Sequence, residues 1–315
     1  MKILLIYYTG TYNTRYLTDR LEGRLLSHGH TVDRVEVNCD TEPVSLSGYD
    51  LLGIGYPIYG FNAPAPLERY LGKLSYPDGL RFFIYKNSGE TFGMNNASSR
   101  IILRRLRRAG AHLHGEYHFV MPYNIHFRFE DDFVRELLDK DEKLMAVMVR
   151  NLERGKVVTI RSRPLYNLGA AFVAIQKVGG NVNSFLYRVD RELCTSCGLC
   201  VRECPEHNIK RTEDGKIVFG HRCDMCMRCS FFCPKDAIRI GFLEGWRVNG
   251  AYPLERLREA GPPEQPYITE ESKGFFSCFP SYYRAVDEAY SDTFPDGEAE
   301  KENSYTSQKT VDCGA

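Results

Sequence analysis

The sequence predicts an α/β protein with a doubly wound, five-stranded parallel sheet, followed by a small α+β domain. Three observations lead to this fold class. The first 160 residues alternate between short apolar runs and amphipathic stretches, eight of the eleven cysteines lie between Cys194 and Cys233, and that cysteine-rich segment is internally repeated. With 315 residues, the chain is long enough for two domains of ordinary size.

Strands and helices are expected to alternate along residues 1–160. The strands are predicted at 2–8, 30–37, 49–57, the start of 80–90, and 115–124. The helices are predicted at 14–29, 65–74, 95–112 and 130–156. In the first helix, Leu17, Leu21 and Leu25 recur at helical spacing and share one face. Strands separated by helices imply a parallel sheet that is covered on both faces.

The rest of the chain divides by composition. A connector is expected at 161–189, with a short apolar helix at 170–179 that the following Gly-Gly-Asn ends. The cysteine-rich domain is expected at 190–245. Residues 246–315 form an acidic C-terminal extension that we expect to be partly disordered. The aromatic stretch "FFSCFPSYY" at 275–283 is the exception, and we expect it to dock back onto the protein.

Composition narrows the classes of function. The apolar fraction is 43% and the net charge is zero, so nothing indicates a chain-wide attraction to nucleic acid or to an anionic membrane. The apolar run at 2–8 is too short for a signal peptide, and no stretch is long enough to span a bilayer. A cytoplasmic location is therefore expected, where clustered thiols bind metal instead of forming disulfides.

The strongest motif is a cysteine run that occurs twice. "CTSCGLCVRECP" at 194–205 recurs 29 residues later as "CDMCMRCSFFCP" at 223–234, and the hexapeptides that follow also match. Three thiolates at i, i+3 and i+6 on a tightly wound loop can hold three corners of one iron–sulfur cubane. A fourth thiolate, placed after a longer step and before a proline, points toward a second cluster. The spacing is therefore typical of iron–sulfur ligation.

Residues 190–240 resemble a bacterial two-cluster ferredoxin. The resemblance implies two [4Fe-4S] clusters, one held by Cys194, Cys197, Cys200 and Cys233, and the other by Cys223, Cys226, Cys229 and Cys204. Two structural zinc sites with four cysteines each are the alternative. Zinc ribbons also use Cys-x-x-Cys pairs, but they usually separate the two pairs by a longer stretch, so this spacing fits zinc poorly.

A polar loop, Thr9-Gly10-Thr11-Tyr12-Asn13-Thr14, joins the first predicted strand to the first helix. Ligands of a doubly wound sheet bind at such carboxyl ends of strands, and a helix N-terminus offers free N–H groups to an anion. The threonine hydroxyls add donors, and glycine lets the backbone curl close. The alternative is an ordinary turn in which Thr11 or Asn13 caps the helix.

This loop resembles the phosphate loop of flavodoxins, a Ser/Thr-Gly-Thr-Gly-Asn-Thr run that holds the phosphate of FMN. The match fails only at Tyr12, where glycine would allow a positive φ. The resemblance implies that residues 9–14 bind the FMN phosphate. We expect Tyr12 to keep a common backbone conformation and to turn its ring outward, over the phosphate or ribityl side of FMN.

The resemblance to flavodoxins covers residues 1–160 and implies their five-stranded sheet order. It also implies contacts to the flavin ring from the loops after the third and fourth strands. The candidates are Pro57, Ile58, Tyr59 and Gly60 in the first of these loops, and Asn87, Ser88 and Gly89 in the second. Tyr56 and Phe61 are further aromatic candidates, but Tyr59 is preferred.

A flavodoxin-like domain followed by a two-cluster ferredoxin resembles the flavodoxin–ferredoxin fusion proteins of anaerobes, the "ferrodoxin" family. The resemblance implies electron transfer between FMN, the two clusters and an external redox partner. The alternatives are an FMN-dependent reductase of a small molecule or quinone, fed by the clusters, and a redox-sensing regulatory module. No nucleophile–base pair indicates hydrolytic chemistry. The arginines of 100–108 are a solvated helix face or a docking patch for an acidic partner.

Overall fold

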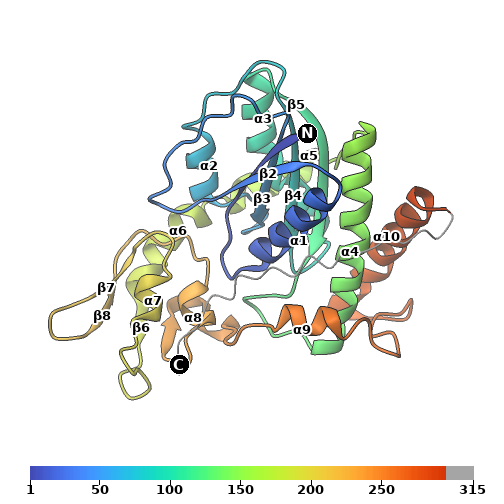
Figure 1. Ribbon diagram of the computed structural model, residues 1–315. Helices are drawn as coiled ribbons and strands as arrows, with labels where there is room; N and C mark the ends of the chain where they lie inside the picture. Colours follow the sequence, from blue (N-terminus) through green and yellow to red (C-terminus); the bar gives the residue numbers. More distant parts are fainter. Residues whose placement is uncertain (296–315) are drawn as a thin grey trace.

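The computed structural model describes residues 1–295 and contains the five-stranded parallel sheet that the sequence predicts (Figure 1). Its strands are β1 (Lys2–Tyr7), β2 (Thr31–Glu36), β3 (Leu51–Pro57), β4 (Arg81–Ser88) and β5 (His112–Val120). They lie in the order β2-β1-β3-β4-β5, and every neighbouring pair is parallel. This order is the flavodoxin-like variant of a doubly wound sheet, so the predicted fold class of the N-terminal part is confirmed.

Helices cover both faces of the sheet. They are α1 (Asn13–Ser27), α2 (Ala65–Leu71), α3 (Arg100–Arg108) and α4 (Asp131–Arg154). Successive side chains of β1 point to opposite faces. Leu5 packs in the core that contains Leu17 of α1 and Phe133 of α4, whereas Leu4 packs in the core that contains residues of α2 and α3. The strands read as continuous apolar runs because both faces are buried.

The cysteine-rich domain is small and lies beneath the carboxyl ends of the strands (Figure 1). It contains the helical turns α7 (Leu199–Arg202) and α8 (Arg228–Phe231). Two antiparallel pairs complete it: β6 (Tyr187–Val189) with β9 (Ile238–Ile240), and β7 (Ile209–Arg211) with β8 (Ile217–Phe219). The backbone repeats with the sequence, since φ is +55° at Ser196 and +52° at its counterpart Met225.

The connector consists of α5 (Pro164–Val173) and α6 (Gln176–Asn183). The expected helix break at Gly179-Gly180-Asn181 is wrong, because α6 continues through these residues. The glycine at 180 has a packing role instead. A Cβ atom there would collide with the carbonyl oxygen of Cys223, so α6 approaches the second cysteine run more closely than another residue would allow.

The C-terminal extension folds back onto α4. After the 3₁₀ turn η3 (Gly241–Trp246), it contains α9 (Leu254–Glu259), the turn η4 (Gly274–Cys278) and α10 (Phe279–Thr293). The aromatic stretch at 275–283 docks as expected: the rings of Phe276 and Phe279 lie edge-on to Phe133 of α4, at centroid distances of 5.3 and 5.0 Å. Most of the tail that we expected to be disordered lies outside the described residues. Within residues 1–295, no helix is long and apolar enough to cross a membrane.

Candidate functional site

A large cavity opens where the strands of the sheet end. Its volume is about 700 Å³, which is in the usual range for cofactor sites. Five parts of the chain form its wall: the strand-end loops of the sheet, α6 of the connector, the second cysteine run, the turn η3 that follows it, and the turn η4 of the C-terminal extension. The site therefore depends on segments that lie far apart in the sequence.

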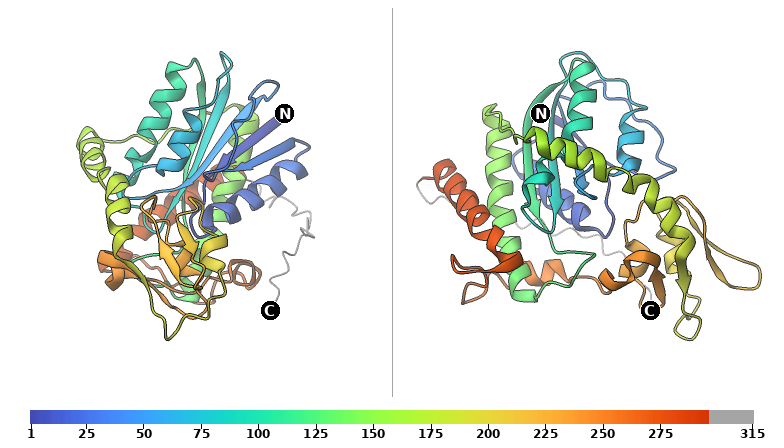
Figure 2. Two further views of the ribbon diagram at one scale, coloured as in Figure 1. Left: turned by 90° about the vertical axis from the view of Figure 1, so that its left-hand side faces the viewer. Right: turned by 180° about the vertical axis from the view of Figure 1, so that it is seen from behind.

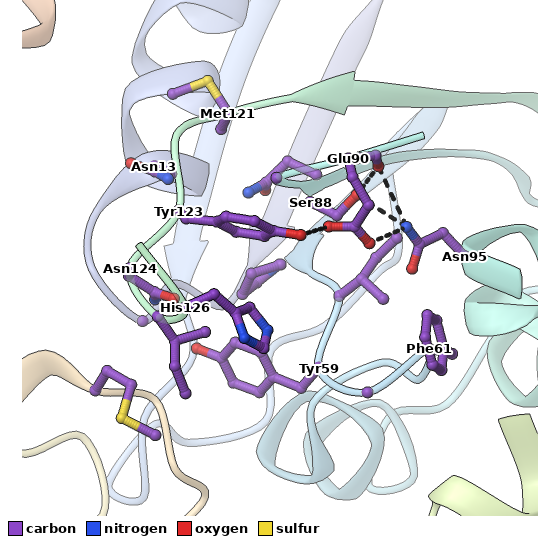
Figure 3. Close-up of a pocket in the computed structure, with 18 of the residues that line it drawn as sticks. Asn13, Tyr59, Phe61, Ser88, Glu90, Asn95, Met121, Tyr123, Asn124 and His126 are labelled. Carbon is purple, nitrogen blue, oxygen red and sulfur yellow. Dashed lines mark hydrogen bonds between the residues drawn. The ribbon is translucent and has the colours of Figure 1, made fainter. Parts of the chain in front are cut away.

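The cavity collects nearly all the residues that the flavodoxin resemblance implies. Twelve of the thirteen line it: Thr9, Gly10, Thr11, Asn13, Thr14, Pro57, Ile58, Tyr59, Gly60, Asn87, Ser88 and Gly89. Tyr12 is the one that does not. Phe61 also lines the wall, whereas Tyr56 is fully buried in the core of the sheet. Figure 3 shows Asn13, Tyr59 and Ser88 around the cavity.

The side chains of the 9–14 loop bind neighbouring loops instead of capping α1. Thr14 Oγ1 donates to Asn87 Oδ1 at 2.8 Å, which ties the first strand-end loop to β4. Asn13 Nδ2 donates to the Pro122 carbonyl oxygen at 2.8 Å. The N-cap residue of α1 is Tyr12, and no side chain caps this helix end. The alternative of a cap by Thr11 or Asn13 is therefore wrong.

Three buried polar atoms on the cavity wall have no hydrogen-bond partner among the described residues: Thr9 Oγ1, the hydroxyl of Tyr59 and Asp224 Oδ2. Burying a hydroxyl without a partner is unfavourable, so such atoms mark a place that a polar ligand can occupy. Gly10 lies in a tight fit against Tyr59. A Cβ atom there would collide with the Tyr59 hydroxyl and lie 2.9 Å from the Cys226 carbonyl oxygen. Thr9 and Gly10 fit the phosphate end of a flavin nucleotide.

Tyr12 differs from the expectation both in its backbone conformation and in the direction of its ring. Its φ is +69°, so it takes the left-handed conformation of the glycine that it replaces. Its ring turns toward the cysteine-rich domain, where it packs on Phe232 at a centroid distance of 4.9 Å and its hydroxyl donates to Glu203. Burial and the Glu203 carboxylate raise the pKa of Tyr12 to about 12. Tyr12 thus contacts the cysteine-rich domain, whereas the other residues of the 9–14 loop line the cavity.

Arg228 is a residue of this region that the sequence did not single out. It lies between Cys226 and Cys229, it is 6% exposed, and it reaches across to the 9–14 loop. Its guanidinium donates to the carbonyl oxygens of Thr9 and Gly10, both at 2.6 Å, and to that of Glu203 at 3.2 Å. The sequence did contain a signal for Arg228, because the matching position of the first cysteine run is the apolar Leu199. Arg228 joins the second run to the candidate phosphate loop.

The eight run cysteines gather into the two sets that the ferredoxin resemblance implies. One small cavity is lined by Cys194, Cys197, Cys200 and Cys233, and another by Cys204, Cys223, Cys226 and Cys229. The fourth cysteine of each run therefore lies with the first three of the other run. Backbone N–H groups point at the sulfur atoms at matching positions, as from Asn208 to Cys204 at 3.3 Å and from Ala237 to Cys233 at 3.2 Å.

The spacing of these sulfur atoms separates a cluster from a single zinc ion. Among the described residues, only Cys39, Asp40 and His207 form a group of three or more metal-ligand side chains whose ligand atoms all lie within 4.8 Å of one another. Four thiolates around one zinc ion, each about 2.3 Å from the metal, would lie about 3.8 Å apart. Neither cysteine set forms such a close group among the described residues, which favours a larger inorganic group over a single zinc ion.

The thiols of each set are crowded together, which also favours the binding of a cationic group. Burial raises the pKa of Cys200 to about 11, and the Cys197, Cys233 and Cys194 thiols add to the shift. In the second set, burial and the neighbouring Cys226 raise the pKa of Cys223 to about 12. Burial of these two thiols disfavours their charged form, whereas bound iron supplies positive charge that stabilises thiolates.

Aromatic side chains line the part of the cavity beside the loop that follows β5. Tyr123 points across it and donates to Glu90, which also accepts a hydrogen bond from Asn95 Nδ2 at 2.8 Å (Figure 3). The ring of His126 lies 5.2 Å from Tyr123 and 5.4 Å from Trp246. Phe275 and Cys278 of the extension complete this part of the wall. The sequence did not predict their contribution, because no local pattern indicates where the extension docks.

Comparison with known proteins identifies the cysteine-rich segment. Residues 193–238 match the family model of the 4Fe-4S dicluster domain. This segment is a ferredoxin-type domain. Over 51 residues the chain is 35% identical to a ferredoxin from Pyrobaculum islandicum, a match that covers 16% of this chain. It covers 48% of the ferredoxin, so the chain spans about half the length of the curated relative that it matches.

The N-terminal part is similar in structure to flavodoxins. A short-chain flavodoxin associated with a non-canonical PDU bacterial microcompartment is 15% identical; the match covers 50% of this chain and 99% of that one, with a TM-score of 0.39. A flavodoxin from the domain Archaea is 14% identical over 49% of this chain and 99% of its own, with a TM-score of 0.36. The parallel strand order of the sheet itself identifies the flavodoxin-like fold.

Proposed function

We propose that this protein is an electron-transfer flavo-iron–sulfur protein, with FMN in the large cavity and a [4Fe-4S] cluster on each cysteine set. In this proposal, residues 1–160 form the FMN domain, 161–189 a connector, 190–245 the two-cluster domain, and 246–315 an extension. An external redox partner exchanges electrons with the protein. A general role in redox chemistry is supported independently of the cofactor assignment, because a ferredoxin-type domain serves redox chemistry.

The observation that carries the proposal is a shared wall. Asp224, Met225 and Met227 of the second cysteine run line the same cavity as Thr9 and Thr14 of the candidate phosphate loop. Arg228, from the same run, is hydrogen-bonded to the carbonyl oxygens of that loop. One chain thus holds the flavin site and a cluster site in direct contact. That is the arrangement expected when electrons pass between them.

The residues of this chain position and shield the cofactors. Thr9, Thr11 and Thr14 would offer hydroxyl groups to the FMN phosphate, while Tyr59 and the backbone of 87–89 would lie along the ring. The cysteine sets would hold the clusters, with backbone N–H groups directed at the sulfur atoms. A flavin accepts two electrons and can release them singly, whereas a cubane carries one, so their combination links pair donors to single-electron carriers.

The external partner is better placed at the first cysteine run than on the arginine-rich helix. Cys197 is exposed, whereas Arg104, Arg107 and Arg108 follow α3 away from the cavity. Figure 1 shows α3 at the end of the sheet opposite the cysteine-rich domain. A carrier bound to those arginines would lie far from both proposed redox sites. We therefore propose that the partner docks at the loop around Cys197.

One combined assay on anaerobically purified holoprotein tests the proposal. About eight iron atoms per chain and one FMN are expected, with electron paramagnetic resonance signals of two reduced cubanes. The Cys226→Ser and Cys197→Ser variants should each lose one cluster signal. Zinc in place of iron, or protein that binds no FMN when FMN is added, would refute the proposal.

A second candidate function is an FMN-dependent reductase of a small molecule or quinone. The aromatic part of the cavity wall favours it, because Tyr123, His126, Trp246 and Phe275 line the same cavity as the candidate flavin loops. Aromatic walls with a few polar groups are typical of sites for flat organic molecules. Screening quinones for turnover under a reducing donor, with Trp246→Ala as the site variant and Val218→Ala as the control, separates a reductase from a pure carrier.

A further inference from the structure

The connector helices α5 and α6 have their apolar side outward. Apolar side chains recur every three or four residues along them and are strongly exposed: Leu165, Leu168, Phe172, Ile175, Val178, Val182 and, in the turn that follows, Phe185. Phe172 is 81% exposed and Leu165 is 73% exposed. This spacing places them along one face. An ordinary surface helix turns such a face toward the core.

The inward side of the same helices is made of small and polar residues. Ala170 is buried, and its carbonyl oxygen accepts from Asn62 Nδ2 at 2.9 Å. Gly180 packs on the second cysteine run. Asn183 is buried, with Nδ2 donating to the Ile240 carbonyl oxygen at 3.1 Å. The helices are therefore held by backbone contacts and amides, and their apolar stripe makes no contribution to the core.

A further exposed aromatic side chain lies near the end of α6. Asn183 Oδ1 also accepts from the backbone N–H of Phe242 at 2.9 Å, which brings the turn η3 against the end of α6. Phe242 is 78% exposed. Figure 2 (right) shows α5 and α6, in yellow-green, along the outside of the molecule. We call these exposed side chains the apolar face: Leu165, Leu168, Phe172, Ile175, Val178, Val182, Phe185 and Phe242.

The chain segment that carries α5 and α6 has charged residues of one sign only. From 154 to 189 the sequence has no Asp or Glu, and its charged residues are Arg154, Lys156, Arg161, Arg163, Lys177 and Arg188. Among them, Lys177 is paired with Glu68. Arg154, Lys156, Arg161, Arg163 and Arg188 are exposed. A partner of the apolar face therefore meets a basic border.

We propose that the apolar face docks this protein on a lipid bilayer surface that carries anionic headgroups. A helix with bulky apolar residues on one side and basic residues at its border lies in the plane of such an interface. Phosphate groups of the lipids neutralise the arginines, and the acyl boundary takes the Leu, Ile and Phe side chains. No transmembrane helix is required, and none is found within residues 1–295.

A second copy of the chain fits the same face less well. Antiparallel pairing of two apolar faces would bring Arg161 and Arg163 of one copy toward Arg188 of the other. With no acidic residue between 154 and 189, the helices α5 and α6 offer no complementary charge of their own. Like charges brought together destabilise an interface. The charge pattern thus favours an anionic surface over self-association.

The test is vesicle co-sedimentation of the full-length holoprotein under anaerobic conditions. Wild-type protein should bind phosphatidylcholine vesicles that contain phosphatidylglycerol, and bind pure phosphatidylcholine vesicles only weakly. Leu168→Ser with Phe172→Ser should weaken partitioning by roughly tenfold or more, since two exposed anchors are lost. Arg161→Gln and Arg163→Gln should each weaken binding to the anionic vesicles by roughly fivefold and reduce its salt dependence. Val218→Ser, at an exposed residue of β8, should change nothing.

Three results would overturn the proposal. Wild-type protein that ignores anionic vesicles is one, and binding that Leu168→Ser with Phe172→Ser leaves unchanged is another. The third is a dimer in light scattering that the same double variant converts to a monomer, because a second copy would then cover the face. If vesicles fail but polyglutamate binds and the arginine variants lose that binding, the face belongs to an acidic protein partner instead. Cofactor content is measured in every sample, so the outcome is independent of the proposed redox function.

Discussion

The two cysteine runs share a motif and a backbone but not an environment. Positive φ angles recur at matching positions, +74° at Gly198 and +63° at Met227. None of the residues of α7 in the first run is buried, whereas Arg228, Ser230 and Phe231 of α8 in the second run are. The spacing of the cysteines determines the loop and the ligand sets. The residues between the cysteines determine which run faces the sheet.

This difference in environment makes the two halves of the repeat inequivalent. The second run lines the large cavity and binds the 9–14 loop through Arg228, while the first run exposes Cys197. A symmetrical motif thereby acquires an inner and an outer site. If the proposed cofactors occupy these sites, the inner cluster lies next to the flavin and the outer one is accessible to a partner.

The largest effect is expected at Arg228. Its replacement by methionine, Arg228→Met, leaves the buried carbonyl oxygens of Thr9, Gly10 and Glu203 without their donor. We expect a loss of about 3 kcal/mol or more in the free energy of unfolding, because unpaired buried polar groups are costly. We also expect a lower FMN content. Urea unfolding of the holoprotein, with flavin fluorescence of the released fraction, measures both.

Arg202→Met is the matched control, since Arg202 is exposed in α7 of the first run. It should change the free energy of unfolding by less than about 0.5 kcal/mol. Equal losses in the two variants would mean that the runs are energetically equivalent, and the distinction between an inner and an outer site would fail.

Removal of iron should separate the two sets in time. A chelator with a mild oxidant reaches the exposed Cys197 before it reaches a set whose helix α8 is buried. About half of the iron should leave in a fast phase, and the other half should leave only as the domains separate. Iron release followed by electron paramagnetic resonance would show one cluster signal disappearing first. A single phase that removes both signals together would contradict the comparison.

Tyr12 tests the contact between the inner run and the sheet. Tyr12→Gly relieves a positive φ, which costs a side chain about 1–2 kcal/mol, but it removes the packing on Phe232 and the hydrogen bond to Glu203. The losses should exceed the gain, for a net destabilisation of about 1 kcal/mol. Tyr12→Phe keeps the ring and should lose about 1 kcal/mol or less. Thermal unfolding at one pH measures both variants. If Tyr12→Gly is more stable than the wild type, the ring does not hold the domains together.

The sequence predicted what local spacing controls. Alternating apolar segments gave the parallel sheet, and three cysteines at i, i+3 and i+6 gave the loops on which both sets are built. It did not predict contacts that depend on how the domains meet. Tyr12 was assigned to the ligand, because nothing in residues 9–14 shows that Glu203 and Phe232 lie beside them. The glycine at 180 was taken for a helix break, because its close approach to Cys223 is visible only when α6 and the second run are packed together.

The smallest prediction concerns the strain that the two runs share. Ser196 and Met225 both have a positive φ, and the backbone N–H of each points at a cysteine sulfur atom at 3.4 Å. Ser196→Gly should stabilise the protein by about 0.5–1 kcal/mol, because glycine takes this conformation without a steric penalty and the N–H group is retained. Met225→Gly gains the same relief but loses its packing against α6, so it should destabilise the protein by about 1 kcal/mol. Opposite signs in urea unfolding would show that the runs are equivalent in backbone and differ in what their side chains contact. If both variants change the free energy of unfolding in the same direction, the difference between the two runs does not lie in these side chains.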